Sequence, residues 1–361
     1  MEEQKQAKQQ MQIDSDILNT LSTAVRVSKK KGNLDRDEYK KGINASKTET
    51  LFLLFEDVLK KFDMPSTDED KLSIASALLK GVNYTIKDIE ELCPILSQSY
   101  ANGTTSIGIF ISAAINKIIK ETDTINLDFA GIEVNYLGYN LPCGNLIIKG
   151  NAGKYTGESM QSGSITIHGN AGDWTGCFMK DGSIIVDGNA GKWTGCSMKS
   201  GSITIHGNAG RWTGKSMEGG SIIVDGNAGK WTGDSMQSGS ITIHGNAGDW
   251  TGCFMKDGSI IVDGNAGEYT GDSIQSGSIT IHGNAGEYTG HSMEDGNIIV
   301  DGNVDRWTGD SMQSGSIIVD GNAGDYTGIT SSGGKIVVNK EIKSIGTNAK
   351  AAIFCKGKKV N

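Results

Sequence analysis

The feature that most constrains the fold of this chain is an internal repeat whose units are nineteen residues long. Ten consecutive units fill residues 150–339, and each opens with the dipeptide Gly-Asn, from Gly150 to Gly321. A degenerate unit precedes them, since Gly131 stands one full period before Gly150. Units of such a repeat each form one small structural element and bury their apolar faces by stacking on their neighbours.

Each unit reads close to G-N-A-G-x-[WY]-T-G-x-S-M-x-x-G-S-I-x-[IV]-x, and we number its positions 1 to 19 from the first glycine. Positions 15 to 18 alternate between apolar and polar residues, so that Ile165 and Ile167 point one way while Thr166 points the other. This is the pattern of a strand with one solvent-exposed face. The unit is too short for a strand and a crossover helix, and its glycines at positions 1, 4, 8 and 14 would break a helix. The sequence therefore predicts an all-β parallel β-helix of about eleven such coils, whose equivalent strands lie about 4.8 Å apart.

Residues at one position in successive coils form a column, and each column has its own expected role. The isoleucines at position 16, beginning with Ile165, and the methionines at position 11, beginning with Met160, should stack as the core. The glycines should supply the positive φ that tight corners demand. The asparagines at position 2, beginning with Asn151, should bond their own backbone or the amide of the next coil.

Before about residue 125 the sequence has helical spacing instead of the repeat. Four segments predict the helices of a small bundle. They are residues 48–64, 67–82, 86–100 and 104–120. Thr67 has the character of an N-cap, and Pro94 should kink or divide the third helix.

Together the repeat and the helical spacing predict four parts of the chain. They are a disordered tail at 1–14, a helical bundle domain at 15–124, a parallel β-helix repeat domain at 125–340, and a C-terminal cap and basic tail at 341–361.

Composition excludes several classes of function. The formal net charge of -8 argues against a nucleic-acid partner, because phosphate neutralisation needs a surplus of Lys and Arg. The polar start is unlike a secretory signal, and the apolar stretch 107–116 is about half of a membrane span, so we expect a cytoplasmic protein with no membrane partner. The six cysteines show no CxxC spacing. Cys177 and Cys196 occupy equivalent positions on adjacent coils, near enough for a bridge, but we expect free thiols.

The histidine pattern argues against a metal site. His168, His206, His244 and His282 recur on every second coil, so neighbours would lie about 9.6 Å apart, too far to share a zinc ion. Aspartates of the intervening coils, beginning with Asp187, should form with them an outward ladder that alternates imidazole and carboxylate. We predict no metal, no cofactor and no catalytic residue.

One column has the character of a binding surface, because position 6 is aromatic in all ten coils. Its residues are Tyr155, Trp174, Trp193, Trp212, Trp231, Trp250, Tyr269, Tyr288, Trp307 and Tyr326. If the aromatic rings point out and the threonine at position 7 points in, the rings form a stripe for a protein partner or for self-association. The alternative is that the rings stack to seal a corner of the coil.

The run G-N-A-G-D-W-T-G-C-F-M-K-D-G-S-I-I-V-D-G resembles a known glycine-repeat (GXGXG) β-helix. That β-helix is shared by the glycine-repeat subunit of formylmethanofuran dehydrogenase and the C-terminal domain of glutamate synthase large subunits. The resemblance covers about residues 125–340, and it implies a non-catalytic structural element that joins catalytic parts. The chain departs from both families in its helical first part and in its more numerous, more uniform units.

Three functions compete on this sequence. We favour a non-catalytic β-helix scaffold or protein-interaction module, with the helical domain capping one end. The alternative is an accessory structural subunit of an oxidoreductase complex similar to formylmethanofuran dehydrogenase or glutamate synthase, with an oxidoreductase catalytic subunit as its partner. A third hypothesis is a carbohydrate or ice binder that uses the aromatic or threonine columns.

Overall fold

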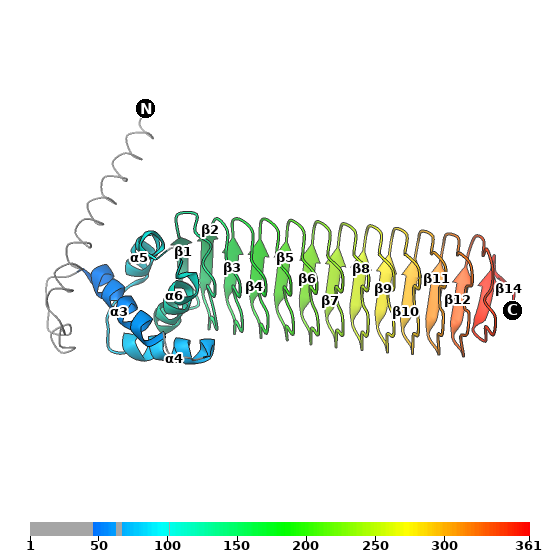
Figure 1. Cartoon of the computed structure of the whole chain (residues 1–361), viewed down its shortest axis with the longest axis horizontal. Helices are drawn as coiled ribbons and strands as arrows, with labels where there is room; N and C mark the ends of the chain where they lie inside the picture. Colours follow the sequence, from blue (N-terminus) through cyan, green and yellow to red (C-terminus); the bar gives the residue numbers. More distant parts are fainter. Residues whose placement is uncertain (1–45, 63–66, 101) are drawn as a thin grey trace, which may run out of the picture. The chain divides into compact units, whose positions relative to one another are not determined.

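The computed structural model describes residues 46–62, 67–100 and 102–361, and it separates into two compact units (Figure 1). The first unit is Met1–Ile118 and the second is Ile119–Asn361. The predicted tail at 1–14 and the beginning of the predicted helical domain lie outside the described residues.

The first unit contains the four predicted helices. They are α3 (Lys47–Phe62), α4 (Asp68–Leu79), α5 (Ile86–Ser99) and α6 (Thr104–Ile118). Helix α6 packs against each of the other three, and every residue from Ile107 to Ile115 is buried. The apolar stretch at 107–116 is therefore the core of this unit. Among the described residues, no helix has both the length and the apolar character needed to cross a membrane.

The helix ends follow the sequence, but Pro94 does not divide α5. Thr67 caps α4 in a reciprocal capping box with Asp70. Helix α5 continues on both sides of Pro94, with Leu92 and Leu96 fully buried. Two buried leucines contribute about 1.5–3 kcal/mol each, which offsets the cost of about 3 kcal/mol for a proline inside a helix.

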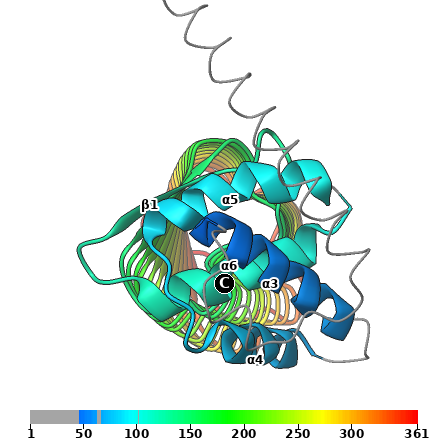
Figure 2. The same ribbon diagram turned by 90° about the vertical axis from the view of Figure 1, so that its left-hand side faces the viewer.

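The second unit is the parallel β-solenoid that the repeat predicts, and it has about twelve turns where about eleven were expected. Its strands form one sheet in sequence order (Figure 1). They are β1 (Thr124–Asp128), β2 (Asn145–Lys149), β3 (Ser164–Ile167), β4 (Ser183–Val186), β5 (Ser202–Ile205), β6 (Ser221–Val224), β7 (Ser240–Ile243), β8 (Ser259–Val262), β9 (Ser278–Ile281), β10 (Asn297–Val300), β11 (Ser316–Val319), β12 (Lys335–Val338), β13 (Ala352–Cys355) and β14 (Lys358–Lys359). From β3 to β12 each residue pairs with the equivalent residue of the next coil, for example Ile165 with Ile184. In Figure 2, which looks along this unit, successive coils lie almost on top of one another.

The predicted core columns lie inside the solenoid. The isoleucines at position 16 and the methionines at position 11 are fully buried, from Ile165 and Met160 onward. The asparagine side chains bond to the next coil, because the Asn151 Oδ1 accepts from the Asn170 backbone N at 2.9 Å and the same bond recurs along the column. The core and the asparagine ladder thus fix the stacking register.

The glycines have two roles, of which the sequence suggested only one. Those at positions 8 and 14, such as Gly157 (φ 69°) and Gly163 (φ 86°), have the expected positive φ. Those at positions 1 and 4 are needed for close approach, since a Cβ on Gly172 would lie 2.6 Å from the carbonyl carbon of Gly153. The glycines at positions 1 and 4 were also expected to have a positive φ. That conformation is found largely at positions 6 and 10 instead, which carry side chains.

The far end of the sheet is closed by a short hairpin. Strand β13 pairs in parallel with β12 on one side, and β14 pairs antiparallel with its other side. The Val360 N donates to the Ile353 O at 2.9 Å, so β14 and the residues after it cover part of the edge that β13 would otherwise expose.

Candidate functional site

The rings at position 6 stack on one another along the solenoid and form what we call the aromatic column. Successive ring centroids lie 4.1–6.0 Å apart, and the ring planes stay within 17° of parallel. The stack begins at Tyr136, in the degenerate first coil, and ends at Tyr326. Among the described residues no ring contact joins Trp212 to Trp231, so the column consists of two stacked runs.

The backbone directs these rings outward and the following threonine inward. All ten residues at position 6 have a positive φ, for example 64° at Trp193. The threonines at position 7 are fully buried, and the Thr175 hydroxyl donates to the Gly172 carbonyl at 2.9 Å. Most rings are half-buried, while Tyr326 is 47% exposed. The column therefore presents ring edges to the outside.

Stacking also decides which ligands the column can take. A sugar or a nucleobase that stacks on an aromatic side chain needs a free ring face. Here the faces are covered by the neighbouring rings, except at the ends and between Trp212 and Trp231. The geometry therefore argues against the carbohydrate hypothesis.

The residues at position 9 form a second column, and here the expectation of free thiols at Cys177 and Cys196 is wrong. These two cysteines are joined by a disulfide with a Cα–Cα distance of 4.6 Å. In-register stacking brings equivalent residues of adjacent coils within the range that a disulfide requires. The other cysteines in the described ranges, Cys93, Cys143, Cys253 and Cys355, are not joined by a disulfide.

The position-9 column continues with charged pairs that the sequence reasoning missed. The Lys215 Nζ lies 2.8 Å from the buried Asp234 carboxylate. The His291 Nδ1 lies 2.8 Å from Asp272, whose hydrogen bond raises the pKa of the imidazole. Opposite charges at the same position of adjacent units were the available signal for these pairs.

Cys253, in the same column, is a poor candidate nucleophile. Its side chain is fully buried, and its Sγ lies 3.7 Å from an Asp272 carboxylate oxygen. Burial first, and then the charges of Asp272 and Asp234, raise the pKa of the thiol. The reactive thiolate is therefore suppressed at neutral pH.

The histidines at position 19 form the outward ladder that their spacing predicts. Each Nδ1 pairs with the aspartate of the next coil at 2.6–2.8 Å, as His168 does with Asp187. Within the described ranges, no three His, Cys, Asp or Glu side chains are grouped in a way that could hold a metal ion. These histidines thus contribute to stacking between coils.

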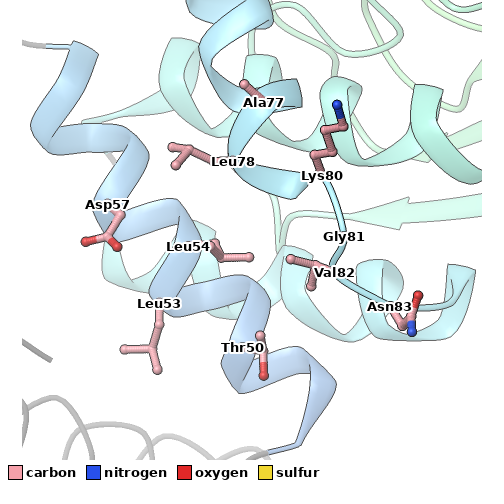
Figure 3. A pocket seen from close by; sticks show the side chains of 10 residues that line it. All are labelled: Thr50, Leu53, Leu54, Asp57, Ala77, Leu78, Lys80, Gly81, Val82 and Asn83. Carbon is pink, nitrogen blue, oxygen red and sulfur yellow. The ribbon is translucent and has the colours of Figure 1, made fainter. Parts of the chain in front are cut away.

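The helical unit has a groove that the sequence did not indicate (Figure 3). It has a volume of about 650 Å³ and lies between α3, α4 and the segment that follows α4. Its lining is about equally polar and apolar, with aliphatic side chains such as Leu53, Leu54 and Val82 beside the charged side chains of Asp57 and Lys80. The Asp57 carboxylate pairs with Lys60 at 2.9 Å.

Comparisons with known proteins give a likeness to solved structures. No family model matches the sequence, and no curated protein matches it. Among solved structures, a chain of the formyltransferase/hydrolase complex of Methylorubrum extorquens, solved with methylofuran, is similar at 27% identity with a TM-score of 0.31. The match covers 44% of this chain and 55% of that chain, about half of the neighbour's length. The glutamate synthase side of the expected resemblance has no support in these comparisons.

Proposed function

We propose that this chain is a non-catalytic scaffold whose solenoid binds a protein along the aromatic column. The observation that carries the proposal is the column itself: a row of half-buried rings with covered faces and outward edges. Aromatic side chains with one exposed edge are enriched at protein interfaces. A column that follows many coils offers a long, straight contact line.

The histidines at position 19 and the cysteines at position 9 support this assignment, because stacking engages them. The histidines at position 19 are bound to aspartates, Cys177 is bound to Cys196, and Cys253 is buried. Groups engaged in this way hold adjacent coils together and are not arranged as a nucleophile with its base.

The alternative is an accessory structural subunit of an oxidoreductase complex. Its support is the glycine-repeat sequence motif of residues 150–339, which resembles the motif of the glycine-repeat subunit of formylmethanofuran dehydrogenase. This alternative differs from the general scaffold in one respect that can be measured: a metal-cofactor subunit would copurify with the chain.

Affinity capture from the native host tests the proposal. The tagged full chain is compared at low salt with a variant carrying Trp193→Asn and Trp250→Asn, because Asn tolerates the positive φ at position 6. The matched control is Ile223→Thr, which removes an exposed apolar side chain where the adjacent coils carry Thr204 and Thr242. Mass spectrometry should find a protein that the wild type and the control retain and the column variant loses. Capture that is equal in all three chains, or no captured protein, would contradict the proposal.

A further inference from the structure

The residues at position 5, next to the aromatic column, are charged in all ten coils, and we call them the charge column. They are Lys154, Asp173, Lys192, Arg211, Lys230, Asp249, Glu268, Glu287, Arg306 and Asp325. All are at least partly exposed. The Arg306 guanidinium lies 4.5 Å from the centre of the Trp307 ring, so the two columns are in contact.

The order of charges in this column has an unusual property. Reading the column backwards inverts the sign at every position, so that the first residue is opposite in charge to the tenth and the fifth to the sixth. The five complementary pairs are Lys154 with Asp325, Asp173 with Arg306, Lys192 with Glu287, Arg211 with Glu268, and Lys230 with Asp249. A column with this order is complementary to a reversed copy of itself.

Within one chain the same order is partly unfavourable. Three basic coils (192, 211, 230) are followed by three acidic coils (249, 268, 287), and like charges about 4.8 Å apart repel. Ion pairs between column residues form at three of the five steps where the sign changes, as between Lys154 and Asp173 at 3.5 Å. In the described part of the chain, Lys192, Arg211 and Glu268 have no ion-pair partner.

The solenoid keeps this column straight enough to face another. Within each of the two stacked runs the rings beside it stay within 17° of parallel, and the coils superpose when viewed along the unit (Figure 2). Ten coils have nine intervals of about 4.8 Å, so the charges are spread over about 43 Å. Two such columns can lie side by side over their full length.

We propose that a second copy of this chain binds antiparallel along the charge column, with a two-fold axis between Lys230 and Asp249. This arrangement places Arg211 of each copy opposite Glu268 of the other, and Lys192 opposite Glu287. A two-fold interface uses the same surface on both copies, which a column complementary to its own reverse satisfies. A parallel arrangement in the same register would place every charge opposite itself. The inference rests on the proposed role of the solenoid as a binding surface and names one partner for it.

The contact should depend strongly on salt, because its charges are exposed. The Debye length is about 10 Å at 0.1 M and about 3 Å at 1 M salt. Individual exposed ion pairs contribute little, but an ordered row of them fixes orientation and excludes wrong arrangements. We expect a dimer at low salt that dissociates as the salt concentration rises.

Sedimentation of the full chain at about 0.05 M and about 1 M salt tests this inference. Arg211→Glu alone and Glu268→Arg alone should each raise the dimer dissociation constant about tenfold or more, because one substitution creates two repulsive contacts across a two-fold axis. The double variant should restore the dimer. Lys256→Glu, an exposed substitution with the same charge change at position 12, is the matched control and should have little effect.

Three results would overturn the inference: a monomer at low salt and high concentration, a dimer insensitive to Arg211→Glu, or a double variant that stays dissociated. Circular dichroism of each variant distinguishes lost association from lost folding. If the chain stays monomeric but still captures a protein through the aromatic column, the self-association inference is wrong and the proposed scaffold function stands. If it dimerises through the charge column but captures no protein, the proposed scaffold function is wrong and the self-association inference stands.

Discussion

At the scale of single residues, each corner position of the solenoid requires either glycine or a residue that tolerates a positive φ. Position 4 is glycine in nine of the ten units, with Asp305 as the exception. Position 6 instead carries an aromatic residue at positive φ, a conformation that costs about 1–3 kcal/mol for a residue other than glycine. Stacking between rings is worth about 0.5–1.5 kcal/mol per pair beyond burial, which offsets much of this cost.

Gly210 at position 4 offers a test of close approach. A Cβ there would lie 2.7 Å from the backbone atoms of Gly191 and Lys192, so Gly210→Ala forces neighbouring coils apart. We expect a loss of about 1–3 kcal/mol in the free energy of unfolding, measured by urea denaturation. Ser200→Ala, at an exposed position, is the control and should change stability little. An unchanged midpoint for Gly210→Ala would show that the coils relax without cost.

His291 makes stability depend on pH in a defined direction. Its Nδ1 pairs with Asp272, its Nε2 lies 3.9 Å from Asp310, and the hydrogen bond from Asp272 raises its pKa above the ordinary value. A raised pKa in the folded state adds stability that is complete below about pH 6.5 and is lost as the pH rises through the folded-state pKa.

The expected result is a difference between two chains. From about pH 6 to about pH 9, the wild type should lose unfolding free energy relative to His291→Gln, whose side chain does not titrate. His168→Gln is the control, because His168 lies in the exposed histidine–aspartate ladder at position 19 and outside the position-9 column of His291. A wild type and a His291→Gln variant that respond identically to pH would contradict the assignment.

At the scale of elements, each coil is held to its neighbours by columns of equivalent side chains. The buried isoleucines, the asparagine ladder and the histidine–aspartate pairs all join equivalent residues of adjacent coils. The disulfide between Cys177 and Cys196 is the covalent member of this set.

This disulfide should stabilise the solenoid without being required for its fold. Its two cysteines are one coil apart in the sequence, and closing a loop of that length corresponds to about 3 kcal/mol of lost chain entropy. The double variant Cys177→Ser, Cys196→Ser should keep the circular dichroism of the wild type and unfold at lower urea concentration. Thiol titration of the unfolded, unreduced chain should find four reactive cysteines; six would show that the bond is absent.

The same columns show how far the sequence could predict the structure. The short repeat period and the alternation at Ile165 and Ile167 were enough to predict the solenoid, because units this short bury their apolar side chains only by stacking on one another. The disulfide was not predicted, since proximity on adjacent coils permits a bond without requiring it. Of the two outcomes expected at Pro94, a kink or a division, the division does not occur. The cost of the proline is local, whereas the buried leucines that hold α5 together are set by packing against other helices.

The candidate site was only partly visible in the sequence. The aromatic column and its outward direction follow from the recurrence of position 6 beside a buried threonine. Stacking of the rings, which covers their faces, was the alternative that the sequence left open, because it depends on side-chain conformations along the column. The break between Trp212 and Trp231 could not be predicted, since both coils carry tryptophan at position 6.

At the scale of the whole molecule, the chain combines a helical unit with a solenoid whose outer columns carry rings and charges. The histidines at position 19 and the disulfide between Cys177 and Cys196 are engaged in stacking, while the aromatic edges point outward. All six tryptophans of the chain belong to the aromatic column, so tryptophan fluorescence reports on that surface alone. This column is the surface on which we propose that a protein partner binds.

Quenching of tryptophan emission by acrylamide, a neutral quencher that leaves the ionic strength unchanged, tests this placement without any substitution in the chain. It should be measured on the free chain and on the complex captured from the native host. We predict accessible tryptophans in the free chain and reduced quenching in the complex. Tryptophans fully protected in the free chain, or quenching that the partner leaves unchanged, would contradict the proposed binding surface.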